Sequence, residues 1–332
     1  MQSVDPIQTH VRPHRYLWGV PKKPLAQPGD PCRPDNRKTA TRAPHLITDP
    51  LLDADLIAVH QWLIAQPIDV LLREATDSAV KYVLDGARTW RFDLLDSSVD
   101  SDERASVGTK LQYHVIQSLG LKKQPPLDTS IVGVAVEIKG TVRATWMIPK
   151  EGQCEVTLLL RIDAERNRFA CWLMRTHRAW LNEGANQDGK RTPRADAVPN
   201  YALTVVPWTD LPPEPLKALD AAQLAEVFDD RGLKLRLASL FRFLPGVVIP
   251  RGSITTVGAG LHDPLRRARE VKEYLLRNDG LVVLVGKWAS ERALAKKLGF
   301  DISDAAWVAV PLQRFAAAGL NPPTPGVLGQ NP

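Results

Sequence analysis

Residues 130–139 read SIVGVAVEIK, and the alternation in this stretch decides the fold expected for the chain around it. Side chains point alternately to the two faces of an extended chain. One face is then apolar and the other combines small residues with an acid and a lysine. We predict a single strand that packs its valines on a core. Its apolar face holds Val132, Val134, Val136 and Ile138, and its other face holds Ile131, Gly133, Ala135, Glu137 and Lys139.

Periodicity on either side of this strand predicts the neighbouring elements. Upstream, apolar residues recur at helical spacing over 54–65, 69–84 and 109–119. The second helix is expected to end at Asp85-Gly86, because glycine readily takes the left-handed cap conformation. Downstream, alternation predicts strands over 155–162 and 169–174. Helices packed on a short mixed sheet give an α/β (α+β) fold for this half.

The length of 332 residues predicts two domains plus tails, because a single core rarely grows that large. The stretch 187–215 is expected to be loop-like, and 212-PPEP-215 has the composition of a linker. The expected division is a basic, Pro-rich, loosely packed extension (1–48), a first domain (49–211), a second domain (212–315) and a disordered tail (316–332).

The second domain has the pattern of a helix-turn-helix followed by a wing. Two short helices meet across a turn at Gly232, and strands follow. Between residues 231 and 299 there are 14 Lys or Arg against 5 Asp or Glu, whereas the whole chain carries a net charge of only +6. A basic module joined to a near-neutral one favours a nucleic-acid partner. The elements expected are helices over 220–229, 233–244, 264–277 and 290–298 and strands over 247–257 and 281–285.

Composition argues against secretion and against a membrane span. No apolar run approaches the roughly 20 residues that a spanning helix needs, and Asp5, His10 and Arg12 stand where a signal peptide would be apolar. A cytoplasmic protein with reduced thiols is therefore expected. Cys32, Cys154 and Cys171 are far apart in the sequence, and the spacing of Cys32 and the N-terminal histidines His10, His14 and His45 is too irregular to predict a metal site.

Glu137 and Lys139 are candidates for catalysis. Two positions apart on one strand face, they lie roughly 7 Å apart along the chain, and both can point at one phosphate. Asp128 precedes the strand by two residues, so it can converge with Glu137 on a divalent cation. Mg²⁺ prefers such hard oxygen ligands. Lys139 could then lower the pKa of an attacking water or stabilise charge on the phosphorus.

An acid-x-lysine pair on a strand is also typical of an ordinary solvated face. The residues Glu137 and Lys139 alone do not distinguish this structural role from a catalytic one. Two features favour catalysis. Asp128 lies at a suitable distance, and Gly133 and Ala135 leave room for a large substrate.

A set of motifs extends over residues 72–312 in a defined order and spacing. Through these motifs the chain resembles the NaeI family of type II restriction endonucleases, within the PD-(D/E)xK nuclease superfamily. The motifs are 85-DGxRT-89, Gly108-Thr109, 131-IxGVxVExK-139, 146-WMxPxE-151, 240-LFR-242, 254-IxTV-257 and Leu298-Gly299.

The resemblance implies a restriction-endonuclease-like mixed sheet flanked by helices, followed by a C-terminal winged-helix domain. It implies a sequence-specific, Mg²⁺-dependent endonuclease, with Mn²⁺ as a possible substitute, that cuts double-stranded DNA to 5′-phosphate ends. The site residues fall on Asp128, Glu137 and Lys139, of which the two acids would bind metal. Two departures stand out: Glu137 replaces the family's aspartate, and the neutral Gln112 aligns with a catalytic helix glutamate.

Candidate DNA contacts lie in the basic second domain. The helix over 233–244 is the expected recognition helix, and Arg251 is a candidate wing contact at a hairpin bend. The family also implies two DNA copies per subunit, and a palindromic target favours a homodimer. The remaining contacts expected on the recognition helix and on the following helix are Lys234, Arg236, Ser239, Arg242, Arg266, Arg267 and Arg269.

Two alternatives stay open at this point. The neutral Gln112 favours a DNA-binding protein that kept the nuclease fold and lost or reduced cleavage. A nicking or repair nuclease on the same scaffold is the other alternative.

Overall fold

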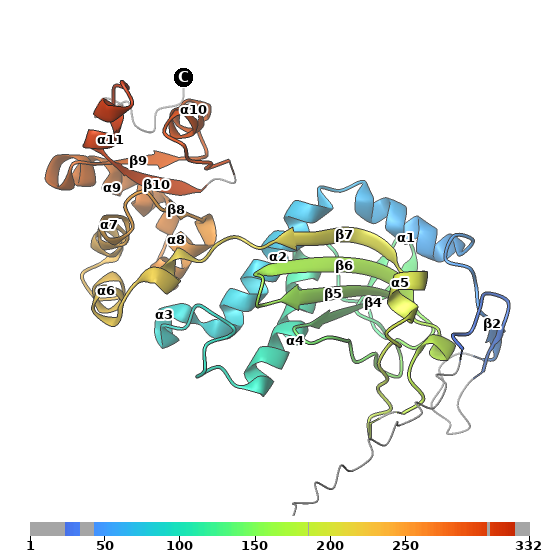
Figure 1. Ribbon diagram of the computed structural model, residues 1–332. Coiled ribbons are helices and arrows are strands. Elements are labelled where there is room, and N and C mark those ends of the chain that lie inside the picture. The colour runs from blue at the N-terminus through green and yellow to red at the C-terminus, as the bar shows by residue number, and fades with distance from the viewer. Residues whose placement is uncertain (1–23, 34–42, 185, 304–305, 323–332) are drawn as a thin grey trace, which may run out of the picture.

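A five-stranded mixed sheet forms the centre of the N-terminal part of the protein (Figure 1). The structure is a computed structural model that describes residues 24–33, 43–184, 186–303 and 306–322. The strand order is β3-β4-β5-β6-β7, in which β4 and β5 are parallel and the other neighbours antiparallel. The predicted mixed sheet flanked by helices is confirmed. The strands are β3 (Thr129–Ile131), β4 (Val134–Thr141), β5 (Val156–Asp163), β6 (Arg168–Arg175) and β7 (Leu203–Asp210).

The single strand predicted over 130–139 is wrong, because the chain reverses within it. Val132 and Gly133 have φ of 46° and 84° and form a two-residue turn, and Ile131 pairs with Val134 across the resulting hairpin. Both positive φ values are those of a primed hairpin turn, for which alternation of apolar residues gives no signal. Val132 is consequently 56% exposed, while Val136 and Ile138 remain in the core as expected.

Helices α1 (Ala54–Ile64), α2 (Ile68–Leu84) and α4 (Ser101–Ser118) cover one face of the sheet (Figure 1). Helix α4 begins eight residues earlier than predicted. Its N-cap is Asp100, whose carboxylate accepts hydrogen bonds from two backbone N–H groups of the first turn. Gly108, which was expected to precede this helix, lies inside it.

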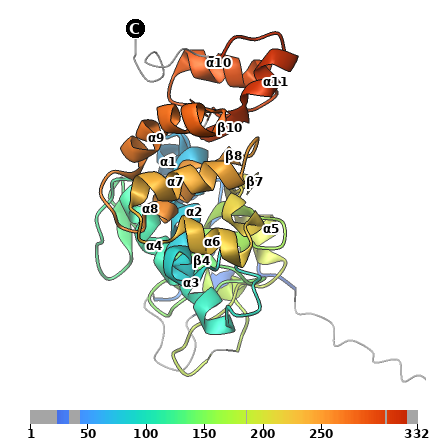
Figure 2. The same cartoon turned by 90° about the vertical axis from the view of Figure 1, so that its left-hand side faces the viewer.

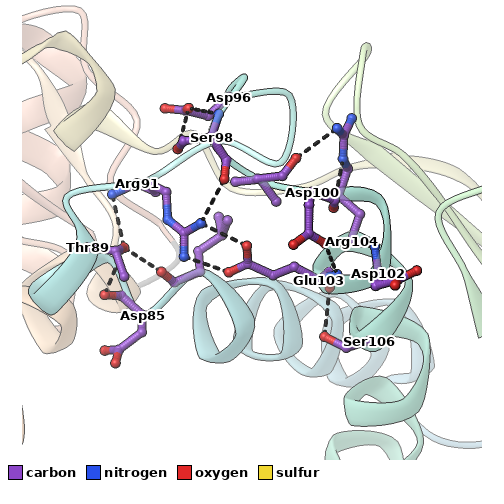
Figure 3. A network of polar contacts seen from close by, with 12 residues as sticks. Asp85, Thr89, Arg91, Asp96, Ser98, Asp100, Asp102, Glu103, Arg104 and Ser106 are labelled. Atoms are coloured by element: carbon purple, nitrogen blue, oxygen red, sulfur yellow. Dashed lines mark hydrogen bonds and ion pairs between the residues drawn. The ribbon is translucent and has the colours of Figure 1, made fainter.

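The loop before α4 is fixed by a polar network (Figure 3). Arg91 donates to both carboxylate oxygens of Glu103, at 2.6 and 2.8 Å, and to the carbonyl of Ser98. Asp85, with φ of 44°, provides the left-handed cap of α2, so the assignment of that role to Gly86 was wrong. Gly86 instead starts α3 (Gly86–Thr89), where the ring of Phe92 occupies the space of a Cβ.

A second core lies on the other face of the sheet. It includes two N-terminal segments that form the small hairpin of β1 (Pro31–Cys32) and β2 (His45–Leu46). Cys32 and Ile47 are 1% and 2% exposed and pack in this core, whereas the other described residues of 24–33 and 43–48 are exposed or half-buried. Residues 1–23 and 34–42 lie outside the described part of the chain.

The stretch 187–215 is more ordered than its composition suggests. It contains α5 (Ala197–Tyr201), strand β7 and the start of the 3-10 helix η2 (Pro215–Ala218). Pro207 lies within β7, which is the last strand in the sheet order. An edge strand tolerates proline because its outer backbone groups need no partner.

The C-terminal part is built on a three-stranded antiparallel sheet in the order β8-β10-β9. Helices α6 to α9 share a core with one face of this sheet, and α10 and α11 pack on the other face. The elements are α6 (Ala221–Val227), α7 (Leu233–Phe243), β8 (Val248–Ile249), α8 (Arg251–Gly258), α9 (Pro264–Asp279), β9 (Leu281–Val285), α10 (Ala289–Lys297), β10 (Trp307–Pro311) and α11 (Leu312–Ala317).

The four helices predicted for this part are present, but the strand predicted over 247–257 is wrong. Only Val248–Ile249 is extended, and Pro250 caps helix α8 directly after it. Ile254 and Val257, three residues apart, are buried on one side of that helix. Strand β10 and helix α11 were not predicted. Residues 323–332 of the expected tail lie outside the described residues, whereas Phe315, just ahead of that tail, is fully buried.

The two parts meet where α8 lies beside α2 (Figures 1 and 2). Lys81 of α2 forms ion pairs with Asp77 at 2.9 Å and Glu214 at 3.4 Å, and Ser253 of α8 donates to Glu214 at 2.9 Å. Among the described residues, no helix has both the length and the apolar character needed to cross a membrane.

Candidate active site

Glu137 and Lys139 form an ion pair on strand β4. The Nζ atom of Lys139 lies 2.5 Å from Oε1 of Glu137. The Glu137 side chain is only 4% exposed, whereas the Lys139 side chain is 24% exposed, so the lysine is the more accessible member of the pair. Burial raises the pKa of Glu137, and the charge of Lys139 opposes that rise. The structure thus brings together the acid and the lysine that the sequence singled out.

Asp128 joins them from the residue just before β3. Its Oδ2 accepts a hydrogen bond of 2.9 Å from the backbone N–H of Ile138, the residue between Glu137 and Lys139. The hairpin at 132–133 makes this possible, because it folds residues 128–131 back along β4. Asp128 is 7% exposed, and burial raises the pKa of its carboxyl group.

Gln112 reaches the same carboxylate from helix α4. Its amide nitrogen donates to Oδ1 of Asp128. The approach depends on two glycines: a Cβ at Gly108 would overlap the carbonyl oxygen of Gly140, and a Cβ at Gly140 would lie 3.0 Å from the carbonyl oxygen of Gly108. Glycine at both positions therefore lets α4 pack flush against β4.

Glu151 is a further acidic residue of the site that was not singled out from the sequence. It lies in the turn before β5, and its charge adds to the rise in the pKa of both Asp128 and Glu137. The next residue, Gly152, packs so closely that a Cβ there would lie 3.1 Å from Cγ of Glu137. The sequence signal for Glu151 was its place in the motif 146-WMxPxE-151.

The donor set of these residues fits a hard divalent cation. Asp128 and Glu137 supply buried carboxylate oxygens, and the charge of Asp128 raises the pKa of Glu137 in addition to burial. A cation between such groups would offset their repulsion. Gln112 is compatible with this arrangement, because half a turn of its amide would present an oxygen instead of the nitrogen.

An arginine-lined groove lies on the same face of the sheet as Glu137 and Lys139. Arg161 of β5 lines the groove and is four residues beyond Thr157, which pairs with Glu137. Since side chains alternate along a strand, Arg161 and Thr157 point to one face. The groove's arginines are Arg33, Arg161, Arg178, Arg191 and Arg194, and its acids are Asp30, Glu183 and Asp196.

The structure corrects the expected display of residues on the helix over 233–244. Arg236 is 7% exposed and donates to the carbonyl of Val227, and Ser239 is 1% exposed and donates to Glu226. Arg242 pairs with Asp279 at 2.9 Å. Among the four residues expected to contact DNA there, only Lys234 is exposed, and its ammonium lies over the ring of Tyr274. Helix α7 is therefore mainly a core helix.

The other basic candidates lie on α8 and α9. Arg251 is the first residue of α8 and not part of a hairpin bend, so that expectation was wrong. Arg266 and Arg267 are exposed in the first turn of α9, where both pair with Glu270 at 3.1 and 2.6 Å. Arg269 lies two residues beyond Arg267 in the same helix and is half-buried.

Comparison with known protein families gives a match to the family described as restriction endonuclease NaeI, over residues 63–330. The match covers both the five-stranded sheet with its acidic site and the C-terminal part. The chain belongs to the restriction endonuclease NaeI family. A search of curated proteins finds no match.

Membership in the NaeI family assigns the chain to the site-specific DNA endonucleases, and the predicted resemblance is confirmed. The Asp128, Glu137 and Lys139 cluster lies inside the matched region, as do Gln112 and Glu151.

Proposed function

We propose that this protein is a Mg²⁺-dependent, sequence-specific endonuclease that hydrolyses double-stranded DNA to 5′-phosphate ends, with Mn²⁺ able to replace Mg²⁺. The observation that carries the proposal is the buried Glu137 paired with Lys139 beside Asp128. Family membership supports DNA as the substrate.

In this proposal Asp128 and Glu137 hold the cation, which when bound would polarise the phosphodiester and lower the pKa of a water. Lys139 is the most exposed of the three groups, so its ammonium is placed to meet the phosphate. There it would stabilise the negative charge that develops as a water attacks phosphorus. Gln112 would hold Asp128 in position by its hydrogen bond.

The arginine-lined groove would receive the DNA backbone on the same face of the sheet as this site. Phosphate contacts by arginine fix the position of a duplex without reading its sequence. The groove lies on the same sheet face as Glu137 and Lys139, and five arginines and three acids line it, although Arg178 and Arg191 are buried. Arg161 is held in place by Trp208, whose ring centroid is 5.7 Å from the guanidinium carbon.

We also propose that residues 212–315 form a winged-helix domain after an endonuclease domain over 49–211. The chain order α7-β8-α8-α9-β9-α10-β10, in which α10 lies between β9 and β10, and the sheet order β8-β10-β9 support this assignment. In that arrangement α8 and α9 form the helix-turn-helix, and α9 replaces α7 as the proposed recognition helix. Arg266 and Arg267 in its first turn are the proposed contacts, together with Arg251 and Lys234 as flanking phosphate contacts.

A second candidate function is DNA binding with little or no cleavage. Gln112 favours it, because a neutral amide contributes no negative charge to the metal site. A nicking enzyme is distinguished from both by its product.

Homodimer formation and binding of two DNA copies per subunit belong to the same proposal and are tested by the mass of the protein–DNA complex in sedimentation.

The test is incubation of a mapped supercoiled plasmid with the protein in Mg²⁺ or Mn²⁺. Discrete linear fragments whose ends ligate directly would support the proposed endonuclease, since ligation requires a 5′-phosphate. Nicked circles that never become linear would indicate a nickase. Binding to the plasmid without any cut in either metal would overturn cleavage and leave the DNA-binding alternative.

A further inference from the structure

Cys32, His45, Cys154 and His177 meet at a point distinct from the acidic site. One ligand-capable atom of each residue lies within 4.8 Å of the others. The residues come from strands β1 and β2, from the turn before β5 and from the segment after β6. Cys32, Cys154 and His177 are buried and His45 is half-buried, within the core on the sheet face opposite α2 and α4.

The distances match those of a tetrahedral metal site. The sulfur atoms of Cys32 and Cys154 are 3.7 Å apart. Two thiolates bound to zinc at about 2.3 Å in a tetrahedron have sulfurs about 3.8 Å apart. Nε2 of His45 lies 3.1 Å from Nδ1 of His177, close to the roughly 3.3 Å between two nitrogens bound at about 2.0 Å.

The surroundings orient the ligand atoms. Nδ1 of His45 lies 2.9 Å from the carbonyl oxygen of Ala43, a contact that places the ring proton on Nδ1 and leaves Nε2 free to bind. The backbone N–H of Arg178 donates to the sulfur of Cys154 at 3.3 Å, a hydrogen bond that a metal-bound sulfur can also accept. If His177 binds the metal through Nδ1, its ring proton lies on Nε2. That nitrogen can then no longer accept the long hydrogen bond of 3.4 Å from the backbone N–H of Thr48.

Other uses of these groups fit less well. The sulfur separation of 3.7 Å is far from the roughly 2.05 Å of a disulfide. Cys32 and Cys154 are 1% and 5% exposed, so neither thiol is accessible to a substrate.

We propose that Cys32, His45, Cys154 and His177 bind one structural zinc ion. Four protein ligands leave no position open for substrate, and two soft sulfurs with two imidazoles select zinc over Mg²⁺. The ion would link Cys32 and His45 of the N-terminal segments to Cys154 in the turn that leads into β5. That turn also carries Glu151 and Gly152, which contacts Glu137, so the zinc would support one wall of the catalytic site.

The primary experiment is metal analysis of the full-length protein after purification without chelators. We expect about one zinc per chain in the wild type and in Cys171→Ala, because Cys171 lies in the other core. Cys154→Ser and His45→Gln should each lose zinc or bind it at least tenfold more weakly. Glu137→Ala should keep it, which separates this site from the proposed Mg²⁺ site and makes the result independent of cleavage.

Cobalt substitution provides a second measurement that remains valid if a cysteine variant misfolds. The wild-type protein reconstituted with Co²⁺ should show the intense absorption of tetrahedral cobalt with thiolate charge transfer, and Zn²⁺ should displace it. The proposal is overturned if the folded wild type binds neither metal after reduction and reconstitution. It is equally overturned if mass spectrometry finds a Cys32–Cys154 disulfide in the native protein, or if His45→Gln retains full zinc affinity.

Discussion

The side-chain amide of Gln112 donates a hydrogen bond to Oδ1 of Asp128. Helix α4 therefore meets the proposed metal-binding carboxylate with a neutral group. An acid at position 112 would add a third carboxylate beside Asp128 and Glu137. The same residue thus determines both the charge of the site and the orientation of Asp128.

We expect Gln112→Glu to strengthen metal binding at a cost to the metal-free fold. The added carboxylate should lower the Mg²⁺ concentration for half-maximal cleavage several-fold. Without Mg²⁺ it should reduce the free energy of unfolding by about 1–3 kcal/mol, because Asp128 loses a donor and gains a like charge. Mg²⁺ titrations of cleavage and denaturant unfolding measure the two effects. Gln112→Leu is the matched control, which should lose stability without gaining metal affinity; an unchanged Mg²⁺ requirement in Gln112→Glu would contradict the site.

Gly108→Ala should separate α4 from β4. The new methyl group would overlap the carbonyl oxygen of Gly140, so we expect a loss of about 1–3 kcal/mol in the free energy of unfolding. Thr109→Ala, on the exposed side of the same helix, should change stability by no more than about 0.5 kcal/mol. Urea unfolding of both variants makes the comparison. Equal effects of the two substitutions would argue against the close glycine contact.

Asp128→Asn should stabilise the metal-free protein at neutral pH. Burial raises the pKa of Asp128 in the folded state, so the folded protein binds the proton more tightly than the unfolded chain does. Stability from this group is therefore present at low pH and is lost as pH rises through the folded pKa. We expect the midpoint temperature of Asp128→Asn to exceed that of the wild type at pH 8 in buffer without Mg²⁺, and the gap to shrink towards pH 4. Thermal melts across this pH range measure the difference. A lower midpoint temperature for Asp128→Asn than for the wild type at pH 8 would contradict the account.

Arg266→Ala and Arg267→Ala should weaken DNA binding if α9 is the recognition helix. Removal of one phosphate contact reduces the slope of log affinity against log salt by about 1. Fluorescence anisotropy with duplex DNA over a salt series measures this slope. Arg88→Ala, an exposed arginine of the N-terminal part, is the control and should leave the slope unchanged. If Arg88→Ala and the α9 variants behave alike, α9 does not contact the DNA.

The elements that the sequence predicted are those with a strong local period. Strands β5 and β6 and helices α2 and α9 were found within a few residues, because the helices bury one regular apolar face and the strands are short apolar runs buried on both faces. The hairpin at Val132–Gly133 was missed because its apolar residues continue the alternation through the turn. Helix α8 was missed because its β-branched residues, including Ile254, Thr255 and Val257, favour strands locally and become helical against a tertiary core.

The candidate site was predictable where its residues are close in sequence. Glu137 and Lys139 are two apart, and the backbone of Ile138 between them binds Asp128. The burial of Arg236 depends on contact with Val227 and could not be inferred from the helical pattern of α7 alone. The cysteine–histidine cluster joins His45 to His177, which are 132 residues apart, so no spacing rule could reveal it.

The central claim is that Glu137 and Lys139 carry out cleavage, and single-turnover kinetics on a plasmid containing the target sequence in Mg²⁺ test it most directly. We predict that Glu137→Gln and Lys139→Ala each lower the cleavage rate at least a hundredfold, while both keep wild-type affinity for the DNA within about threefold. Arg143→Ala, which removes an exposed cation four residues beyond Lys139, should cleave at the wild-type rate. Cleavage by Glu137→Gln and Lys139→Ala at the rate of Arg143→Ala would contradict the account.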